Sequence, residues 1–164
     1  MIYLNIGSNL NSVYGDRKTN INMAINLIKD EQIPVIKISK FYETPSYPNS
    51  NDPKFLNTCI QIEFNDSPTN LLVKLNKIEK KLHRYRGTKN EPRTCDIDII
   101  DFKGMIIKNE SLTTPHPKCH TRNFVLLPLK EICPNWIHPI FNKKIDILIK
   151  SLNISLRNEI TTLE

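Results

Sequence analysis

The sequence predicts an α+β domain in which an antiparallel sheet is flanked by helices. Strand-like and helix-like stretches follow one another in the order β, α, β, β, α, β, and shorter elements come after this core. The 164 residues contain no internal repeat or low-complexity linker, and one domain of this length buries roughly two-thirds of its unfolded surface. We therefore expect a single domain over residues 1–164.

The first half of the core is a strand, a helix and a second strand. Residues 2–6 (IYLNI) alternate in polarity as a strand does, and Gly7-Ser8-Asn9 interrupts them. Apolar residues between positions 21 and 28 recur at helical spacing, and Asp16 lies where it can cap that helix. A second strand is expected over residues 34–42.

The second half of the core repeats this order. A strand is expected over residues 55–64, with its even-numbered residues facing the core and with Phe55 and Asn57 on the other face. A Ser-Pro pair begins a helix over residues 67–82, because serine caps helices and proline fits their first turn. The strand at residues 94–102 completes the core.

Shorter elements extend this core. Lys103-Gly104 is a turn into a short strand at residues 105–107, and the spacing predicts a hairpin with the strand before it. Residues 122–132 are expected to be helical up to Pro128, and a last amphipathic helix lies at residues 145–152. The whole is a ferredoxin-like βαββαβ core with an added hairpin and helices.

Composition restricts the classes of function. Lys and Arg outnumber Asp and Glu by six, which favours an anionic partner such as RNA or a nucleotide. The four glycines form neither a GxxxxGK[ST] nor a GxGxxG loop, so Arg, Lys and metal ions would have to hold any phosphate. The sequence has no CxxC pair and no apolar run near the roughly 20 residues of a membrane helix. We therefore expect a cytoplasmic protein with reduced thiols and no membrane partner.

The segment Glu91 to Ile100 (EPRTCDIDII) places two carboxylates in an otherwise apolar strand. Side chains alternate along a strand, so Asp96 and Asp98 point to one face with Cα atoms about 7 Å apart. A solvated strand face is the ordinary explanation of such a pair. The alternative is a Mg²⁺ site, because this ion takes one or two carboxylates together with substrate phosphates.

A basic stretch directly precedes the aspartates. Arg84, Arg86, Lys89 and Arg93 lie within ten positions, so a polyphosphate could be held between these cations and aspartate-bound metal ions. Alone, such a stretch is usually a solvated loop. Beside the two carboxylates it predicts half of a phosphate site.

Two other classes of protein, and one other kind of metal site, are alternatives to this interpretation. A basic ferredoxin-like RNA-binding module would need exposed aromatic and basic residues on the sheet face, where Asp96 and Asp98 would repel phosphate. A metal-dependent nucleotidyltransferase would share the two aspartates but gives no reason for the Phe55 and Asn57 pair. A zinc site at His116, Cys119 and His120 lacks a fourth ligand and is not favoured.

Six short segments follow one another in a recognisable order: IGSNL (6–10), FYETP (41–45), FLN (55–57), PRTCDID (92–98), PHP (115–117) and RNFVLLPL (122–129). They resemble the ordered motifs of the 6-hydroxymethyl-7,8-dihydropterin pyrophosphokinase family (2-amino-4-hydroxy-6-hydroxymethyldihydropteridine diphosphokinase). The PRTCDID, FYETP and FLN segments carry most of the specificity. The resemblance runs from about residue 2 to about residue 140 and is weak over the last 20 or so residues.

The resemblance implies an ATP-dependent diphosphotransferase of folate biosynthesis. The family transfers the β,γ-diphosphate of ATP to the hydroxymethyl group of the pterin and releases AMP, through two Mg²⁺ ions bridged by Asp96 and Asp98. ATP and 6-hydroxymethyl-7,8-dihydropterin are thus the expected small-molecule partners, without nucleic acid. Association or fusion with other folate-pathway enzymes occurs in this family.

The resemblance also implies roles for single residues. Phe55 and Phe124 can sandwich a flat ring, and the amide of Asn57 can bond to its edge. The catalytic phosphate contacts fall on Arg84, Arg86 and Arg93. The nucleotide positions are Asn76, Glu79, Arg93, Ile99, Thr113, His116 and Arg122. The pterin positions are Thr44, Pro45, Phe55, Asn57 and Phe124.

The chain departs from the family in the basic loop His83 to Pro92, which resembles a lid over the site. Asn90 and Glu91 stand where the family often has tryptophan and glycine. We expect a mobile lid that depends more on charge than on stacking, so that its closure is sensitive to salt.

Overall fold

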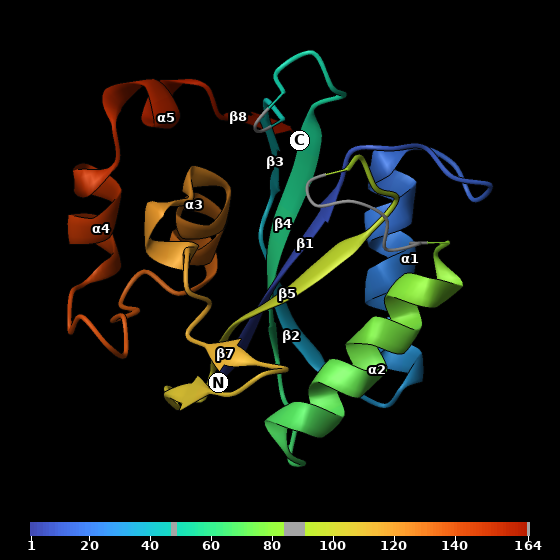
Figure 1. The fold of residues 1–164 in the computed structure, drawn as a ribbon, viewed down its shortest axis with the longest axis horizontal. Coiled ribbons are helices and arrows are strands. Elements are labelled where there is room, and N and C mark those ends of the chain that lie inside the picture. The colour runs from blue at the N-terminus through green and yellow to red at the C-terminus, as the bar shows by residue number, and fades with distance from the viewer. Residues whose placement is uncertain (47–48, 84–90, 164) are drawn as a thin grey trace.

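The computed structural model describes residues 1–46, 49–83 and 91–163, which form an antiparallel sheet with helices on both faces (Figure 1). The helices are α1 (Arg17–Asp30), α2 (Pro68–Lys81), η1 (Cys119–Thr121), α3 (Asn123–Ile132), α4 (Ile145–Ser151) and α5 (Ile154–Asn158). The strands are β1 (Ile2–Ser8), β2 (Val35–Ile38), β3 (Phe41–Thr44), β4 (Phe55–Ile62), β5 (Asp96–Phe102), β6 (Ile107–Lys108), β7 (Thr113–Thr114) and β8 (Thr161–Leu163).

The sheet confirms the predicted ferredoxin-like core. β5, β1 and β4 lie side by side, and both β2 and β3 pair with β4, all antiparallel. β2 and β3 are the two parts of the strand that the sequence predicts over residues 34–42. Ser39 lies between them: its N–H donates to the Cys59 carbonyl oxygen, but the Cys59 N–H donates to the Ser39 side-chain oxygen in place of a backbone carbonyl.

Both predicted helix caps are confirmed. The side chain of Asp16 accepts a hydrogen bond from the Thr19 N–H at 2.8 Å, and Ser67 accepts one from the Asn70 N–H at 3.2 Å. Each bond satisfies a backbone donor that has no partner within the first turn of its helix. The caps fix where α1 and α2 begin on the sheet face that they share.

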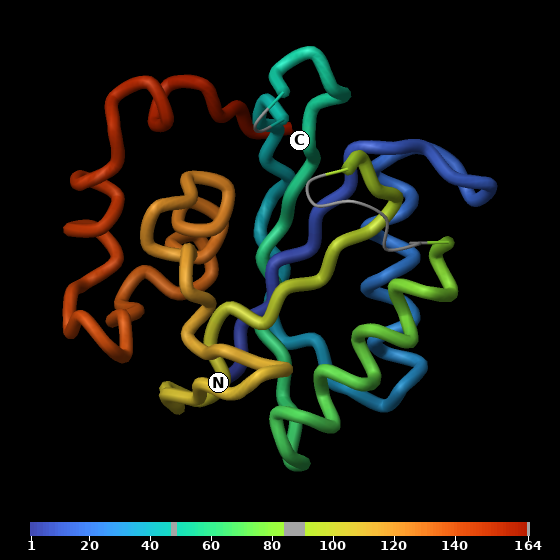
Figure 2. The backbone as a smooth tube through the Cα atoms, viewed as in Figure 1, coloured from blue at the N-terminus to red at the C-terminus, as the bar shows by residue number. Residues whose placement is uncertain are grey.

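The sheet is buried on both faces, which the sequence did not predict. Ile2, Leu4 and Ile60 belong to the core beneath α1 and α2, whereas Tyr3 and Cys59 belong to a second core beneath α3 and α4. The expectation that only one face of the third strand is core is therefore wrong. α3 and α4 lie on the opposite side of the sheet from α1 and α2 (Figure 2).

The added hairpin differs from its prediction. Lys103 and Gly104 turn the chain with positive φ angles, as expected, but residues 105–106 form no strand. β6 instead pairs with β7, because Asn109 caps the loop between them by accepting the Ser111 and Leu112 N–H groups. This hairpin lies beside the edge strand β5.

The C-terminal part also differs from its prediction. α3 continues through Pro128 to Ile132, because burying Leu129 and Ile132 in the second core favours the longer helix. β8, which was not predicted, pairs with β3 and extends the sheet. Among the described helices, none is long and apolar enough to cross a bilayer.

A buried carboxylate links the second core to β5. Asp101 is 4% exposed; its Oδ2 accepts a hydrogen bond from Trp136 Nε1 at 2.7 Å, and its Oδ1 accepts one from the Gly104 N–H. A buried acceptor that loses its donor costs about 1–3 kcal/mol. This contact therefore fixes the segment after α3 against the sheet.

Trp136→Phe tests this contact. The substitution keeps an aromatic ring but removes the N–H that Asp101 needs, so we expect the free energy of unfolding to fall by about 1–3 kcal/mol. Urea denaturation measures the change, and Ile137→Val at the exposed neighbouring position is the control. An unchanged unfolding midpoint for Trp136→Phe would show that the bond contributes nothing.

Candidate active site

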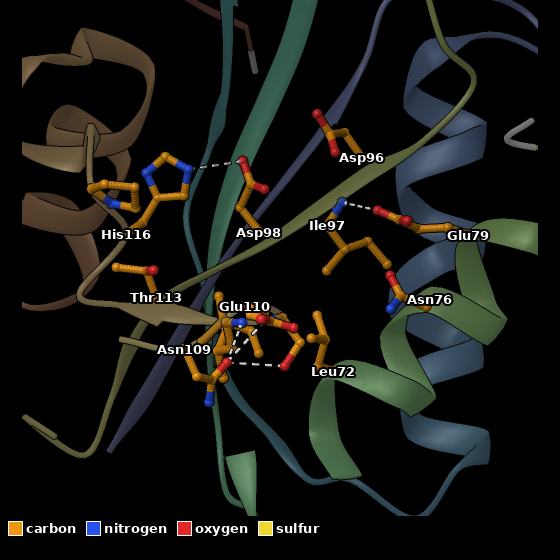
Figure 3. A pocket seen from close by; sticks show the side chains of 14 residues that line it. Leu72, Asn76, Glu79, Asp96, Ile97, Asp98, Asn109, Glu110, Thr113 and His116 are labelled. Carbon is orange, nitrogen blue, oxygen red and sulfur yellow. Dashed lines mark hydrogen bonds and ion pairs between the residues drawn. The ribbon is translucent and has the colours of Figure 1, made fainter. Parts of the chain in front are cut away.

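Two carboxylates stand on the same side of β5, as predicted. Asp96 and Asp98 project together from the strand, and their side chains are 20% and 31% exposed (Figure 3). Between them Ile97 is buried in the core beneath α1 and α2. The strand alternation thus places both charges outside that core while the residue between them anchors the strand.

Cationic groups face both carboxylates. Arg93 Nε lies 2.9 Å from Asp96 Oδ2, and Arg122 Nη1 lies 3.7 Å from Asp98 Oδ2. His116 Nε2 lies 4.0 Å from the same Asp98 oxygen. Burial, and then the positive charge of Arg122, lowers the pKa of His116 to about 4. His116 is therefore neutral near pH 7, and it can donate or accept a hydrogen bond without adding charge.

The N-terminal loop holds Arg93 in place. The Asn9 side-chain oxygen accepts a hydrogen bond from the Arg93 N–H at 2.7 Å, and the Asn9 and Leu10 N–H groups donate to the Arg93 carbonyl oxygen. Asn9 Nδ2 also donates to the carbonyl oxygen of Pro53, in the loop that follows β3. One asparagine therefore links the segment before β5 to the loop before β4.

A cavity of about 300 Å³ opens between α2, β5 and the β6–β7 hairpin. Glu79 lines it, is 4% exposed, and accepts the Ile97 N–H at 2.7 Å, so α2 is bonded to the edge strand. The cavity brings together seven residues that the sequence predicts for metal or nucleotide: Asn76, Glu79, Asp96, Asp98, Ile99, Thr113 and His116. Arg122 joins this group through Asp98.

Two phenylalanines lie beside the same arginines. The Arg93 guanidinium lies 5.3 Å from the Phe55 ring centre, and that of Arg122 lies 5.4 Å from the ring centre of Phe124. These cation–π contacts connect the carboxylate region to the predicted pterin residues. Thr44 pairs with Phe55 between β3 and β4, and Pro45 follows directly.

Gly7 lies between the two halves of the site. On β1 it is the register partner of Asp96 on one side and of Asn57 on the other. A Cβ at this position would come within 2.8 Å of Asn57 Oδ1. The position therefore needs a glycine for the Asn57 side chain to stay where it is.

Some predicted residues are not placed, and some lining residues were not predicted. Arg84, Arg86 and most of the predicted lid lie outside the described residues. Leu72 and the Asn109–Ser111 turn line the cavity, and the sequence analysis predicted neither as part of the site. Asn9 lies in the matching IGSNL segment, so its role could have been suspected.

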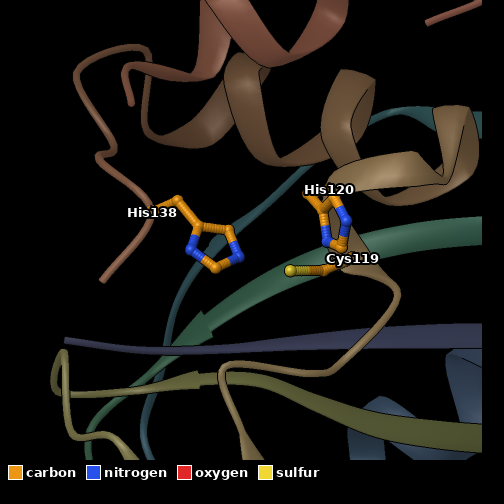
Figure 4. Close-up of side chains that lie close together, drawn as sticks. All are labelled: Cys119, His120 and His138. Carbon is orange, nitrogen blue, oxygen red and sulfur yellow. The ribbon is translucent and has the colours of Figure 1, made fainter. Parts of the chain in front are cut away.

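Three side chains of the kinds that bind metal ions lie together, away from this site. Cys119 and His120 lie near His138, with ligand atoms within 4.8 Å of one another (Figure 4). His116 lies beside Asp98 instead (Figure 3). His138 Nδ1 accepts the Ile140 and Phe141 N–H groups, and burial lowers the pKa of His138, so Nε2 carries the proton. His138 therefore offers no lone pair to a metal ion in this arrangement, and we assign none.

Comparison with known proteins decides the family. A family model described as 7,8-dihydro-6-hydroxymethylpterin-pyrophosphokinase (HPPK) matches residues 3–134. The chain belongs to this pyrophosphokinase family. It is therefore an ATP-dependent diphosphotransferase that acts on hydroxymethyldihydropterin in folate synthesis, and neither the RNA-binding module nor the nucleotidyltransferase is favoured.

Individual relatives agree with this family assignment. The 2-amino-4-hydroxy-6-hydroxymethyldihydropteridine pyrophosphokinase of Aquifex aeolicus is 39% identical over 142 residues, covering 87% of this chain and 86% of that protein. The one from Bacillus subtilis is 38% identical over 132 residues, covering 80% and 77%. A crystal structure of Plasmodium falciparum HPPK-DHPS shares the fold with a TM-score of 0.70 at 15% identity. It covers 98% of this chain, which spans 46% of that longer chain.

Gly7→Ala tests the close approach to Asn57. The added methyl group would push the Asn57 side chain aside, so we expect pterin affinity to fall about tenfold, the scale of one lost hydrogen bond. Affinity for an ATP analogue should not change. Fluorescence titration with each ligand measures both, and equal losses would mean that the substitution disturbs the whole sheet.

Proposed function

We propose that Asp96 and Asp98 hold two Mg²⁺ ions. Both are carboxylates of one strand, and both are partly exposed. Each faces an arginine, which indicates that a positive charge is favourable beside each carboxylate. Oxygen donors of this kind suit Mg²⁺, so the residues fit the ions. When bound, the ions supply charge neutralisation and alignment for phosphoryl transfer.

The proposal assigns ATP to the cavity beside β5. Asn76, Thr113 and His116 line it with neutral polar groups, and Ile99 contributes an apolar wall. Arg93 and Arg122 stand at the carboxylates, where their charges can offset those of the phosphates. Arg84 and Arg86 are proposed as further catalytic contacts on the strength of the motif alone.

The pterin is assigned to the other side of Arg93 and Arg122. Phe55 and Phe124 provide flat apolar faces, and Asn57 provides an amide that is 2% exposed. Thr44 and Pro45, at the end of β3, border the same region. The two substrates would meet near Gly7, which lies in one row between Asp96 and Asn57 and leaves the space that the Asn57 side chain occupies.

In this proposal, each group of residues has its own role in the transfer. The arginines neutralise and orient the phosphates, and the aromatic rings and Asn57 hold the hydroxymethyl carrier in line for attack. His116, which is neutral, can bond to a phosphate or nucleotide group without changing the charge balance. The transfer needs positioning and charge stabilisation more than a covalent step by the protein.

We further propose that residues 1–164 act as a single cytoplasmic pyrophosphokinase domain. Trp136, Ile145 and Leu148, beyond the family match, pack into the same second core as α3, which supports one unit. The cysteines among the described residues are free thiols, as expected for a reducing compartment. The longer Plasmodium HPPK-DHPS chain supports fusion with another folate enzyme as an arrangement open to this domain.

The carboxylate pair facing Arg93 and Arg122 carries this proposal, and Asp96→Asn or Asp98→Asn tests it. Each removes a metal ligand, so we expect a 10²- to 10³-fold loss of Mg²⁺-dependent AMP release, on the order of one lost transition-state contact. Asp30→Asn, at an exposed position of α1, changes the same charge and is the control. Turnover near that of the parent in either variant, with the thermal unfolding midpoint retained, would refute the metal assignment.

Phe124→Ala tests the pterin side. Loss of one stacking face should weaken pterin binding by about 1–3 kcal/mol, as for aromatic stacks on bases, and leave nucleotide affinity unchanged. Calorimetric titration of each substrate separates the two. If both affinities fall equally, Phe124 serves the second core and not the pterin.

A further inference from the structure

A second amide lies directly behind Asn57. Asn5 on β1 is 4% exposed, and its Nδ2 donates a hydrogen bond to Asn57 Oδ1 at 3.3 Å. No residue-level role for Asn5 follows from the motifs. Its placement, however, puts it in contact with one of the proposed pterin residues.

The register places Asn5 at the centre of the site. It is the partner of Asp98 on β5 and of Cys59 on β4, and Asn57 is its diagonal neighbour on β4. These partners share one sheet face, because paired residues of neighbouring strands point the same way. Asn5 therefore lies between the carboxylate pair and Asn57, beneath the proposed meeting point of the substrates.

The amide pair leaves two buried atoms unsatisfied. Within the part of the chain that the structure describes, Asn5 Oδ1 and Asn57 Nδ2 are covered and have no hydrogen-bond partner. Buried polar groups without partners are rare and costly, so a pair of them needs an explanation. Asn57 Oδ1 already accepts the bond from Asn5, so the atom of Asn57 that lacks any partner, and that we take as the one offered to a ligand, is the Nδ2 donor.

We propose that Asn5 is a positioning residue that fixes the orientation of the Asn57 amide and thereby the ring edge that the pterin site accepts. This inference rests on the proposed assignment of Asn57 to the pterin. Asn57 then offers an N–H donor and selects a heterocycle with a carbonyl oxygen at the matching edge position. The covering side chains move aside when the ligand enters, and the donor gains its partner only in the complex.

The need for such a residue follows from the chemistry of the amide. The two ends of an asparagine side chain have nearly the same shape, and a half-turn exchanges donor for acceptor. An unrestrained Asn57 could therefore serve a ring carbonyl or a ring amino group almost equally. The bond couples the two amides, so Asn57 can turn only if Asn5 turns with it; with Asn5 as the donor, Asn57 presents Nδ2 and separates a 4-oxo from a 4-amino ring.

The test compares two ligands across variants of Asn5. Affinities of 6-hydroxymethylpterin and of its 2,4-diamino counterpart are measured by calorimetry with a non-hydrolysable ATP analogue present, and the affinity of that analogue is measured separately. The parent should prefer the oxo compound. Asn5→Leu should reduce this preference about tenfold, the scale of one hydrogen bond, with nucleotide affinity retained.

Asn5→Asp gives a second, directional outcome. A carboxylate can only accept, so it should draw Asn57 Nδ2 toward itself and leave Oδ1 for the ligand, which shifts the preference toward the diamino compound. Gln61→Leu is the matched control, because Gln61 is a buried amide on the same sheet face that has no contact with Asn57 among its hydrogen bonds. It should leave the preference unchanged.

Three results would overturn the role of Asn5: an unchanged preference in Asn5→Leu, an equal loss of nucleotide affinity, or a parent that prefers the diamino compound. Retention of the parent preference in Asn5→Asp would do the same. A parent that binds neither pterin would instead contradict the proposed pterin site itself. The two failures are therefore distinguishable.

Discussion

The site depends on one constraint, the alternation of side chains along an edge strand. β5 buries Ile97 and Ile99 beneath α1 and α2, which forces Asp96 and Asp98 onto the other face. Because β5 is the last strand of the core on that side, its outer edge is open to the cavity beneath the β6–β7 hairpin. Burial of two isoleucines thus fixes where two charges stand.

The charges then organise the residues around them. Arg93 and Arg122 each lie between a carboxylate and an aromatic ring, so the same two side chains border the region proposed for phosphates and the region proposed for the pterin. Their approach to Asp96 and Asp98 lowers the repulsion that two neighbouring carboxylates would otherwise feel. One cation from the preceding residues, Arg93, and one from a distant part of the chain, Arg122, therefore stabilise the carboxylate pair.

The sheet itself separates this protein from other ferredoxin-like modules. An RNA-binding module of this fold uses the open face of its sheet for stacking bases. Here α3 and α4 cover that face, and Cys59 and Ile100 are buried under them. The covered face leaves the ends and the edge of the strands for ligands, where Asn57, Gly7 and Asp96 lie in one row. The basic net charge agrees with the phosphate site that we propose at the strand ends.

The sequence by itself determined the core order, both helix caps and the common face of Asp96 and Asp98. These features depend on local rules: the period of a strand, the spacing of a helix and the donors of its first turn. The ordered motifs determined the family and most candidate residues, because matching segments need no knowledge of their contacts. The predicted hairpin after β5 was wrong, because Lys103-Gly104 indicated only that the chain turns. The side chain of Asn109 caps a later loop, and β6 pairs with β7 there.

Only the tertiary structure decided which distant residues meet. The pairing of Arg122 with Asp98, the anchoring of Arg93 by Asn9 and the amide bond from Asn5 to Asn57 join positions 24 to 84 residues apart. No local pattern encodes such contacts, because they depend on strand register and on how α3 packs against the sheet. The burial of the second face was hidden for the same reason: Tyr3, Cys59 and Ile100 are buried there because they pack with α3 and α4.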